Sequence, residues 1–109
     1  MTDTPAPNPA LKQMQSVLSR WPDFKLGYFV VADTQRRYGA FDQCEDTLKL
    51  AELRFEDDID LHAERIRCSL LRHGVHSNAA MPSIAELRDL ARKDPNDPLV
   101  REIMTLLDQ

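Results

Sequence analysis

The chain has 109 residues, of which 42% are hydrophobic and 29% are charged, and its formal net charge is −4. These values are ordinary for one small globular domain. The acidic balance argues against nucleic acid as the main partner, because binding to phosphates needs a basic surface. No apolar run approaches the roughly 20 residues that a membrane-spanning helix needs, so we expect no membrane partner.

Residues 1–8 are polar and rich in proline, and they predict a disordered tail ahead of a single helical domain over residues 9–109. The tail lacks the basic-then-apolar layout of a signal peptide. Asn8 and Pro9 predict the start of the first helix, as N-cap and first helical residue. An apolar stripe follows at helical spacing: Leu11, Met14, Leu18 and Trp21. Pro22 predicts a break, and we expect Asp23 to cap the next helix.

Residues 25–58 contain two helical patterns that meet at Gly39. Each pattern places apolar or small residues at steps of three and four, which is typical of one face of an α-helix: Tyr28, Val31, Ala32 and Gln35 before the glycine, and Phe41, Cys44, Leu48, Ala51 and Phe55 after it. Gly39 suits the turn, because glycine adopts positive φ without a Cβ clash. The aromatic run from Tyr28 has strand propensity, but no partner strand is present elsewhere, so we predict a helix.

This stretch resembles a tetratricopeptide (TPR) repeat, whose period is about 34 residues. The positions that carry the resemblance are Tyr28 (first aromatic), Val31 and Ala32 (the Leu-Gly pair), Gly39 (turn), Phe41, Cys44 (small residue), Leu48 and Ala51 (second small residue). Gln35 departs from the second aromatic of the family, and Glu56 departs from its closing proline.

The second half of the chain continues in approximately the same phase. Asp57 or Asp58 is predicted to cap a fourth helix that ends at Gly74 and whose core stripe is Ile59, Ala63, Ile66 and Leu70. A long turn over residues 74–82 follows, and Ser83 and Glu86 predict a capping box. Asp97 and Pro98 predict the start of a last helix. The expected fold is all-α: a short TPR-like α-solenoid of about six antiparallel helices, comprising half a repeat, two repeats and a terminal helix in a right-handed superhelical stack.

The resemblance to TPR proteins implies a peptide-binding groove along the first helices of the repeats. The groove positions are Phe29, Asp33, Arg36, Arg37, Glu64, Cys68 and Arg72, with Leu26, Leu61 and Leu71 beside them. Phe29 is a candidate aromatic anchor. The arginines have a second interpretation, since cations near a helix C-terminus are favoured by the helix dipole. The Lys/Asn set with which some TPR proteins bind a C-terminal carboxylate is missing, because Phe29, Val30 and Asp33 stand in those places.

The last helix is apolar on two sides, with Leu99, Ile103 and Leu106 on one and Val100, Met104 and Leu107 on the other. We expect only one side to pack on the preceding hairpin. Either the helix forms a wide stripe wedged between two helices, or a partner or a second copy covers Val100, Met104 and Leu107.

No pattern in the chain predicts catalysis, a cofactor or a metal site. His62, His73 and His76 do not make a compact ligand set with zinc spacing. Cys44 is expected at a helix crossing and Cys68 as a half-exposed thiol, and two cysteines without metal-type spacing fit a reducing cytoplasm.

The sequence therefore predicts a cytoplasmic, non-enzymatic protein-interaction module, a small adaptor or chaperone-like subunit. It would bind a peptide or helix through the groove, the terminal helix or both. Short arrays of this kind occur among chaperones of bacterial secretion systems, an analogy of size and fold only. Two alternatives remain: a structural homodimer that buries the terminal helix, and a TPR-like module associated with a larger enzyme such as a transferase.

Overall fold

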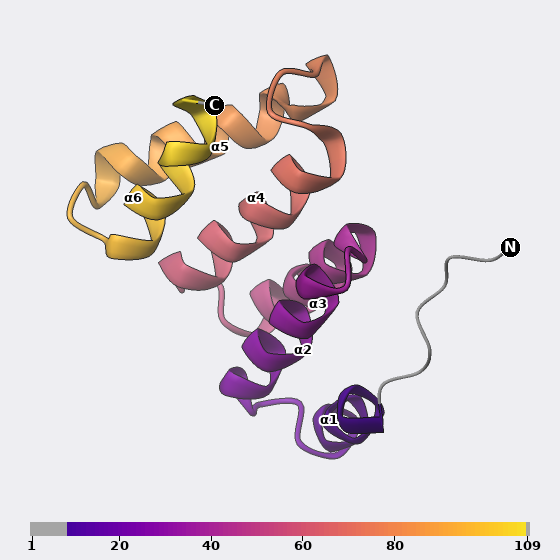
Figure 1. Cartoon of the computed structure of the whole chain (residues 1–109). Coiled ribbons are helices and arrows are strands. Elements are labelled where there is room, and N and C mark those ends of the chain that lie inside the picture. The colour runs from indigo at the N-terminus through magenta and orange to yellow at the C-terminus, as the bar shows by residue number, and fades with distance from the viewer. Residues whose placement is uncertain (1–8, 109) are drawn as a thin grey trace, which may run out of the picture.

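Helices make up nearly all of the chain that the structure, a computed structural model, describes, which is residues 9–108 (Figure 1). Their order is α1 (Pro9–Arg20), α2 (Lys25–Arg37), α3 (Phe41–Arg54), α4 (Ile59–His73), α5 (Met81–Lys93) and α6 (Pro98–Met104), with short 3₁₀ helices η1 (Asn78–Ala80) and η2 (Thr105–Asp108). This stretch contains no strand, so the all-α prediction and the rejection of a strand at Tyr28 are confirmed. The predicted tail and the Asn8 cap lie outside the described residues.

The turns between helices follow the local chemistry of a few residues. Gly39 and Gly74 adopt φ of 78° and 84°, the left-handed region that favours glycine. Asp58 caps α4 by accepting a hydrogen bond from the Leu61 N–H at 3.0 Å. Asp97 caps α6 by accepting from the N–H groups of Leu99 and Val100 at 2.9 and 3.0 Å. Both acidic caps were predicted from the sequence.

Two other predicted caps are wrong. The residue before α2 is Phe24, which makes no side-chain cap, and Asp23 instead pairs with Arg54 of α3 at 3.2 Å. Ser83 lies inside α5, which begins at Met81, and its buried hydroxyl is 2.7 Å from that of Ser69. The Ser83 hydroxyl thus joins α5 to α4 and does not cap its own helix.

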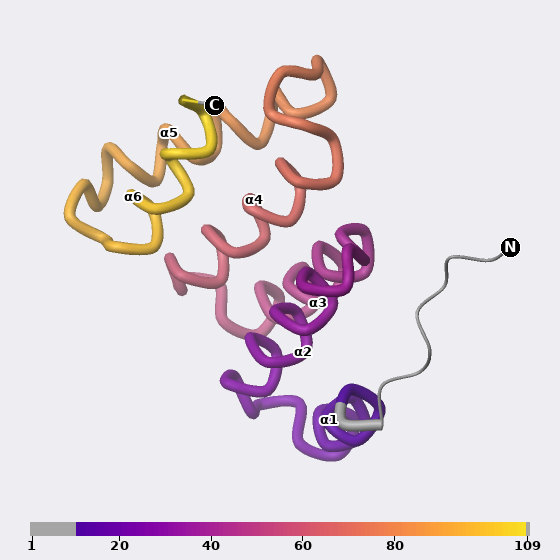
Figure 2. The backbone as a smooth tube through the Cα atoms, viewed as in Figure 1, coloured from indigo at the N-terminus to yellow at the C-terminus, as the bar shows by residue number. Residues whose placement is uncertain are grey.

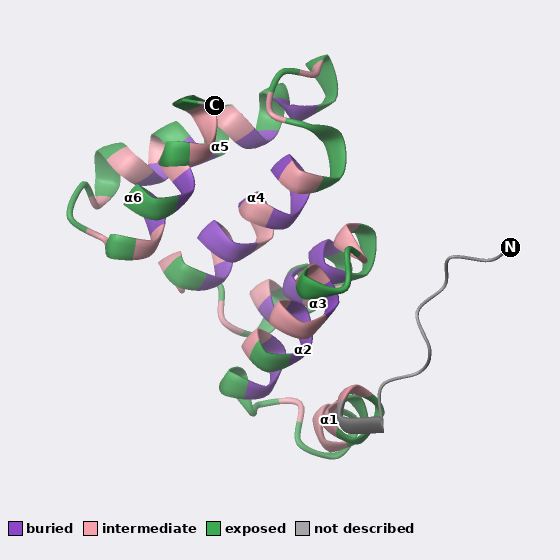
Figure 3. Cartoon of the chain, in the orientation of Figure 1, coloured by how far each residue is buried: buried purple, intermediate pink, exposed green. Residues whose placement is uncertain are grey.

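The central helix of the molecule is α4, which lies between the α2–α3 pair and the α5–α6 pair (Figure 2). One core cluster joins α4 to α2 and α3 and contains Tyr28, Ala32, Cys44, Leu48, Ala51, Leu61 and Cys68. A second cluster joins it to α5 and α6 and contains Ala63, Ile66, Leu70, Ala80, Leu87, Leu90, Val100 and Ile103. Because α4 buries apolar residues on both sides, it is covered on two faces (Figure 3).

Polar contacts between the helices support this core. The buried Gln35 of α2 accepts a hydrogen bond from the Thr47 hydroxyl of α3 at 2.7 Å. Arg65 of α4 contacts Glu52 of α3 at 2.6 Å and also pairs with Glu86 of α5.

In Figure 1, α1 is seen nearly end-on and packs against α2, whereas α4, α5 and α6 lie across the view.

The starts of α2 and α4 are separated by one TPR period of about 34 residues. Each helix of this array also packs on the next one along the chain. The TPR repeat assignment and the right-handed superhelix stay predictions.

Candidate functional site

A shallow pocket lies between α2 and α4, two helices that are not consecutive in the chain. It has a volume of about 280 Å³ and is lined by Phe29, Val30, Asp33, Glu64 and Arg67. We call these five residues the α2–α4 pocket. Its α2 wall is mainly apolar: Phe29 is half-buried against the core, and Val30 is 41% exposed. Its α4 wall is a carboxylate and a guanidinium.

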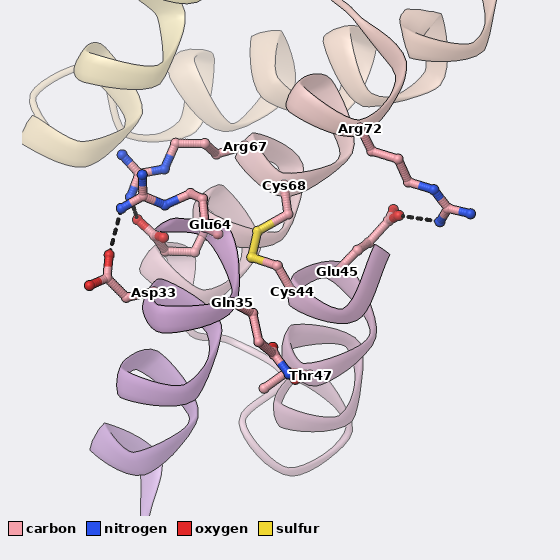
Figure 4. The surroundings of a disulfide bond; sticks show 10 residues. Asp33, Gln35, Cys44, Glu45, Thr47, Glu64, Arg67, Cys68 and Arg72 are labelled. Carbon is pink, nitrogen blue, oxygen red and sulfur yellow. Dashed lines mark hydrogen bonds and ion pairs between the residues drawn. A yellow bond between two sulfur atoms is a disulfide. The ribbon is translucent and has the colours of Figure 1, made fainter. Parts of the chain in front are cut away.

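The charged groups of the pocket are paired with one another and with groups at its rim. Asp33 accepts from Arg36 at 2.5 Å and from Arg37 at 2.9 Å. Glu64 pairs with Arg67, which also reaches Glu102 of α6 at 3.5 Å. Figure 4 shows Asp33, Glu64 and Arg67 together on one side of the α3–α4 contact. The pocket therefore offers both signs of charge beside an apolar surface.

Two guanidinium groups at the pocket are not fully satisfied. The Nε atoms of Arg36 and Arg67 are buried, and neither has a hydrogen-bond partner among the described residues. A buried N–H without an acceptor costs free energy, on the order of 1–3 kcal/mol.

Four of the predicted groove residues, Phe29, Asp33, Arg36 and Glu64, lie in or beside the pocket. Arg37 pairs with Asp33, but its side chain is 73% exposed at the outer edge. The pocket also includes Val30 and Arg67, which were not among the predicted binding residues. Arg67 follows Glu64 by three residues on a helix, and this spacing was the available signal that the two share a face.

Two predicted groove residues lie elsewhere. Cys68 is fully buried and bonded to Cys44, so the expectation of a half-exposed thiol is wrong. Arg72 pairs with Glu45 of α3 at 3.0 Å, on the side of the disulfide away from Asp33 and Arg67 (Figure 4). Leu61 is also fully buried in the core. The true pocket face of α4 is therefore the face of Glu64 and Arg67.

The Cys44–Cys68 disulfide joins α3 to α4. The two Cα atoms are 5.9 Å apart, within the usual range for bonded cysteines, and both side chains are fully buried. The bond closes a loop with a sequence separation of 24 residues. It replaces the pair of free thiols that the sequence suggested, and it fixes α4 relative to the hairpin on which it packs.

A pair of carboxylates lies at the N-terminal ends of α4 and α6. Partial desolvation, a hydrogen bond to Asp97 and the negative charges of Asp97, Asp58 and Glu64 raise the pKa of Asp60 to about 6, although its side chain is exposed in part. The hydrogen bond requires a proton on one of the two carboxyl groups, so this contact depends on pH.

Among residues 9–108, no group of three or more His, Cys, Asp or Glu side chains is arranged to hold a metal ion.

The terminal helix packs more completely than predicted. Val100 is fully buried in the core formed with α4 and α5, and Met104 and Leu107 are half-buried against that core. Leu99 and Leu106 pack there as well, so both apolar sides of the helix contact the rest of the chain. The prediction that only one side packs is wrong, and Val100 cannot contact a partner. Met104 and Leu107 remain accessible in part, along a hollow of about 560 Å³ between α5 and α6.

Similarity to other proteins does not extend these observations. Comparisons with protein-family models, curated proteins and solved structures give no match to this chain. No helix in the described part of the chain is long and apolar enough to cross a membrane.

Proposed function

We propose that this chain is a non-enzymatic protein-interaction module, an adaptor or chaperone-like subunit, which binds a peptide or helix of another protein at the α2–α4 pocket. The observation that supports the proposal is the pocket itself. It lies between two non-consecutive helices and combines an exposed aliphatic side chain, a half-buried aromatic ring and paired charges. An apolar anchor beside polar groups is the usual composition of a peptide-binding hot spot.

The helix α4 that forms one wall of the pocket is held in place before a ligand binds. The disulfide and the core on both sides of α4 hold this helix against α3. A preformed site loses less conformational entropy when a ligand binds, and this saving increases affinity. The ligand chemistry that fits the pocket is an apolar side chain for Phe29 and Val30, followed by a backbone or side-chain oxygen for the guanidinium group of Arg67.

The cysteine spacing in the sequence suggests a reducing, cytoplasmic location. The Cys44–Cys68 bond is more typical of an oxidising compartment.

The proposal is tested by selecting binders from a random peptide library and titrating them against matched variants. Arg67→Ala and Arg72→Ala form one pair, because both arginines lie on α4 and pair with a glutamate, but only Arg67 lines the pocket. Val30→Glu and Leu53→Glu form another, because both side chains are exposed on helices and only Val30 lines the pocket.

We expect Arg67→Ala and Val30→Glu each to weaken binding about tenfold or more, and the two control variants to bind as the wild type does. Circular dichroism of each variant checks that the helices are retained. The proposal is wrong if the selection returns no binder, or if the selected peptides bind all four variants equally.

A further inference from the structure

The two sulfur atoms of the Cys44–Cys68 bond lie inside the core of the folded chain. Both cysteine side chains are fully buried. They share one apolar cluster with side chains of α2, α3 and α4, which are Tyr28, Ala32, Leu48, Ala51 and Leu61. Figure 4 shows the bond crossing from α3 to α4, with charged side chains on either side of it. Exposing either sulfur therefore means uncovering the core that holds these helices together.

The opposite face of α4 is covered as well. Helices α5 and α6 pack on α4 and bury Ile66 and Leu70. Ser69, the residue after Cys68, is also buried, and its hydroxyl is 2.7 Å from that of Ser83 on α5. Because α4 lies between α3 on one side and α5 and α6 on the other, a reagent reaches Cys68 only after α4 has separated from a neighbouring helix.

The chemistry of exchange needs access to a sulfur. A thiolate attacks one of the two bonded sulfurs, and the reaction passes through a mixed disulfide. In reduction by a dithiol, the first thiolate of the reagent bonds to one cysteine sulfur, and the other cysteine leaves as a thiolate and takes up a proton. The second thiolate of the reagent then attacks the reagent sulfur of the mixed disulfide, and the first cysteine leaves in the same way. Two electrons pass from the dithiol to the protein, and the reagent becomes a cyclic disulfide.

We infer that the Cys44–Cys68 bond exchanges only in an opened chain, in which α4 has separated from α3. Formation of the bond follows the same route in reverse, so a disulfide-bearing oxidant must act on this chain before the α3–α4 core closes. The partner that this requires is an oxidant that accepts an unfolded or partly folded chain. Once the core has closed, the bond persists in a medium that contains thiols. The inference is independent of the α2–α4 pocket and of the proposed function.

The size of the protection follows from the stability of the fold. When opening and closing are fast relative to the reaction with thiol, the rate of reduction is proportional to the population of the opened form. For an ordinary folded domain, that population is about one chain in a thousand or fewer. We therefore expect the folded chain to be reduced at least about a thousandfold more slowly than the same chain in denaturing urea.

Reduction by dithiothreitol at a series of urea concentrations tests the inference. The free thiols formed at each time are trapped with an alkylating reagent and counted by mass spectrometry. We expect the logarithm of the reduction rate to rise linearly with urea concentration, with a slope of the same order as that of urea unfolding of the oxidised chain. A reduction rate that does not change with urea, or a purified folded chain whose two cysteines are free, overturns the inference.

Leu48→Ala and Leu53→Ala are the matched variants, because both leucines lie on α3 and only Leu48 belongs to the cluster around the bond. Leu48 is fully buried, whereas Leu53 is 75% exposed. Without urea, Leu48→Ala should be reduced about thirtyfold faster than the wild type or more, because the loss of a buried side chain raises the population of opened chains. Leu53→Ala should be reduced at the wild-type rate.

The variants give one further contrary result. If Leu48→Ala unfolds at lower urea than the wild type but is reduced at the same rate without urea, the sulfurs are reached without opening of the core, and the inference is wrong. Leu48→Val, a smaller truncation, replaces Leu48→Ala if circular dichroism shows that the latter is unfolded.

Discussion

Reduction of the Cys44–Cys68 bond should destabilise the folded chain by an amount set mainly by the loop that the bond closes. A disulfide lowers the conformational entropy of the unfolded chain, and the loss grows with the logarithm of the loop length. For a sequence separation of 24 residues, this relation gives about 3.5 kcal/mol. Because the total stability of a domain this small is on the order of 5–15 kcal/mol, the change is a large fraction of it.

The assay is urea unfolding followed by circular dichroism, with and without a reductant, after equilibration long enough for the buried bond to react. We expect the free energy of unfolding to fall by about 3.5 kcal/mol, which corresponds to a melting temperature lower by about 15 °C. The Cys44→Ala/Cys68→Ala double variant is the control, because its unfolding should not respond to the reductant. Titration of thiols in denaturant without reductant should find none in the wild-type chain.

Two results would refute this reasoning. If the oxidised and reduced wild-type chains unfold at the same urea concentration, the loop contributes nothing to stability. If the unreduced chain has two titratable thiols, Cys44 and Cys68 are not bonded and α4 is held by packing alone.

Three smaller effects follow from single residues, each measured by urea unfolding of the variant. The pKa of folded Asp60 is raised above its unfolded value, so its stabilising contribution is present below the unfolded pKa and is lost as the pH rises through about 6. Asp60→Asn should therefore be more stable than the wild type above that pH, by about 0.5 kcal/mol after allowance for screening of this exposed group, and a constant difference at all pH values would contradict this. Gly39→Ala should cost about 1 kcal/mol because of its φ of 78° alone, since an added Cβ meets nothing within 4 Å, and an unchanged stability would show that the turn relaxes. Leu48→Ala should cost about 2–5 kcal/mol because Leu48 is fully buried, and a cost below 1 kcal/mol would mean that the core around it collapses to fill the space.

The helices could be predicted because their signals are local. Asp58 and Asp97 accept hydrogen bonds from N–H groups two or three residues later, and Gly39 supplies a backbone conformation that its own residue type favours. Ser83 misled the prediction because its S-x-x-E spacing matches a capping box although α5 begins two residues earlier. Its hydroxyl is occupied by Ser69 of another helix, and no local pattern contains that contact.

The candidate site could be predicted only in part, because the pattern of α4 does not show which face is covered by which neighbour. Leu61 and Cys68 pack toward α2 and α3, whereas Ile66 and Leu70 pack toward α5 and α6. With apolar residues on both sides, the helical phase alone could not separate the pocket face from a core face. Cys68 and Arg72 were therefore placed in the groove in error, and Arg67 was left out.

The disulfide could not be predicted for a related reason. The spacing of two cysteines in the sequence does not reveal their distance in the fold. Cys44 faces Cys68 because α3 packs along α4, with Cys44 on the inward stripe of one helix and Cys68 on that of the other. The environment of Cys44, a helix crossing, was predicted correctly, whereas its partner across that crossing is determined only by the packing.

One ion pair connects the α2–α4 pocket to α6. Arg67 reaches from the pocket to Glu102 of α6. The distance of this ion pair is 3.5 Å and Glu102 is 67% exposed, so the contribution of the pair to stability is small. Peptide binding should therefore differ little between the wild-type chain and Glu102→Ala. A large loss of peptide binding in Glu102→Ala would instead mean that this ion pair positions Arg67 for the peptide.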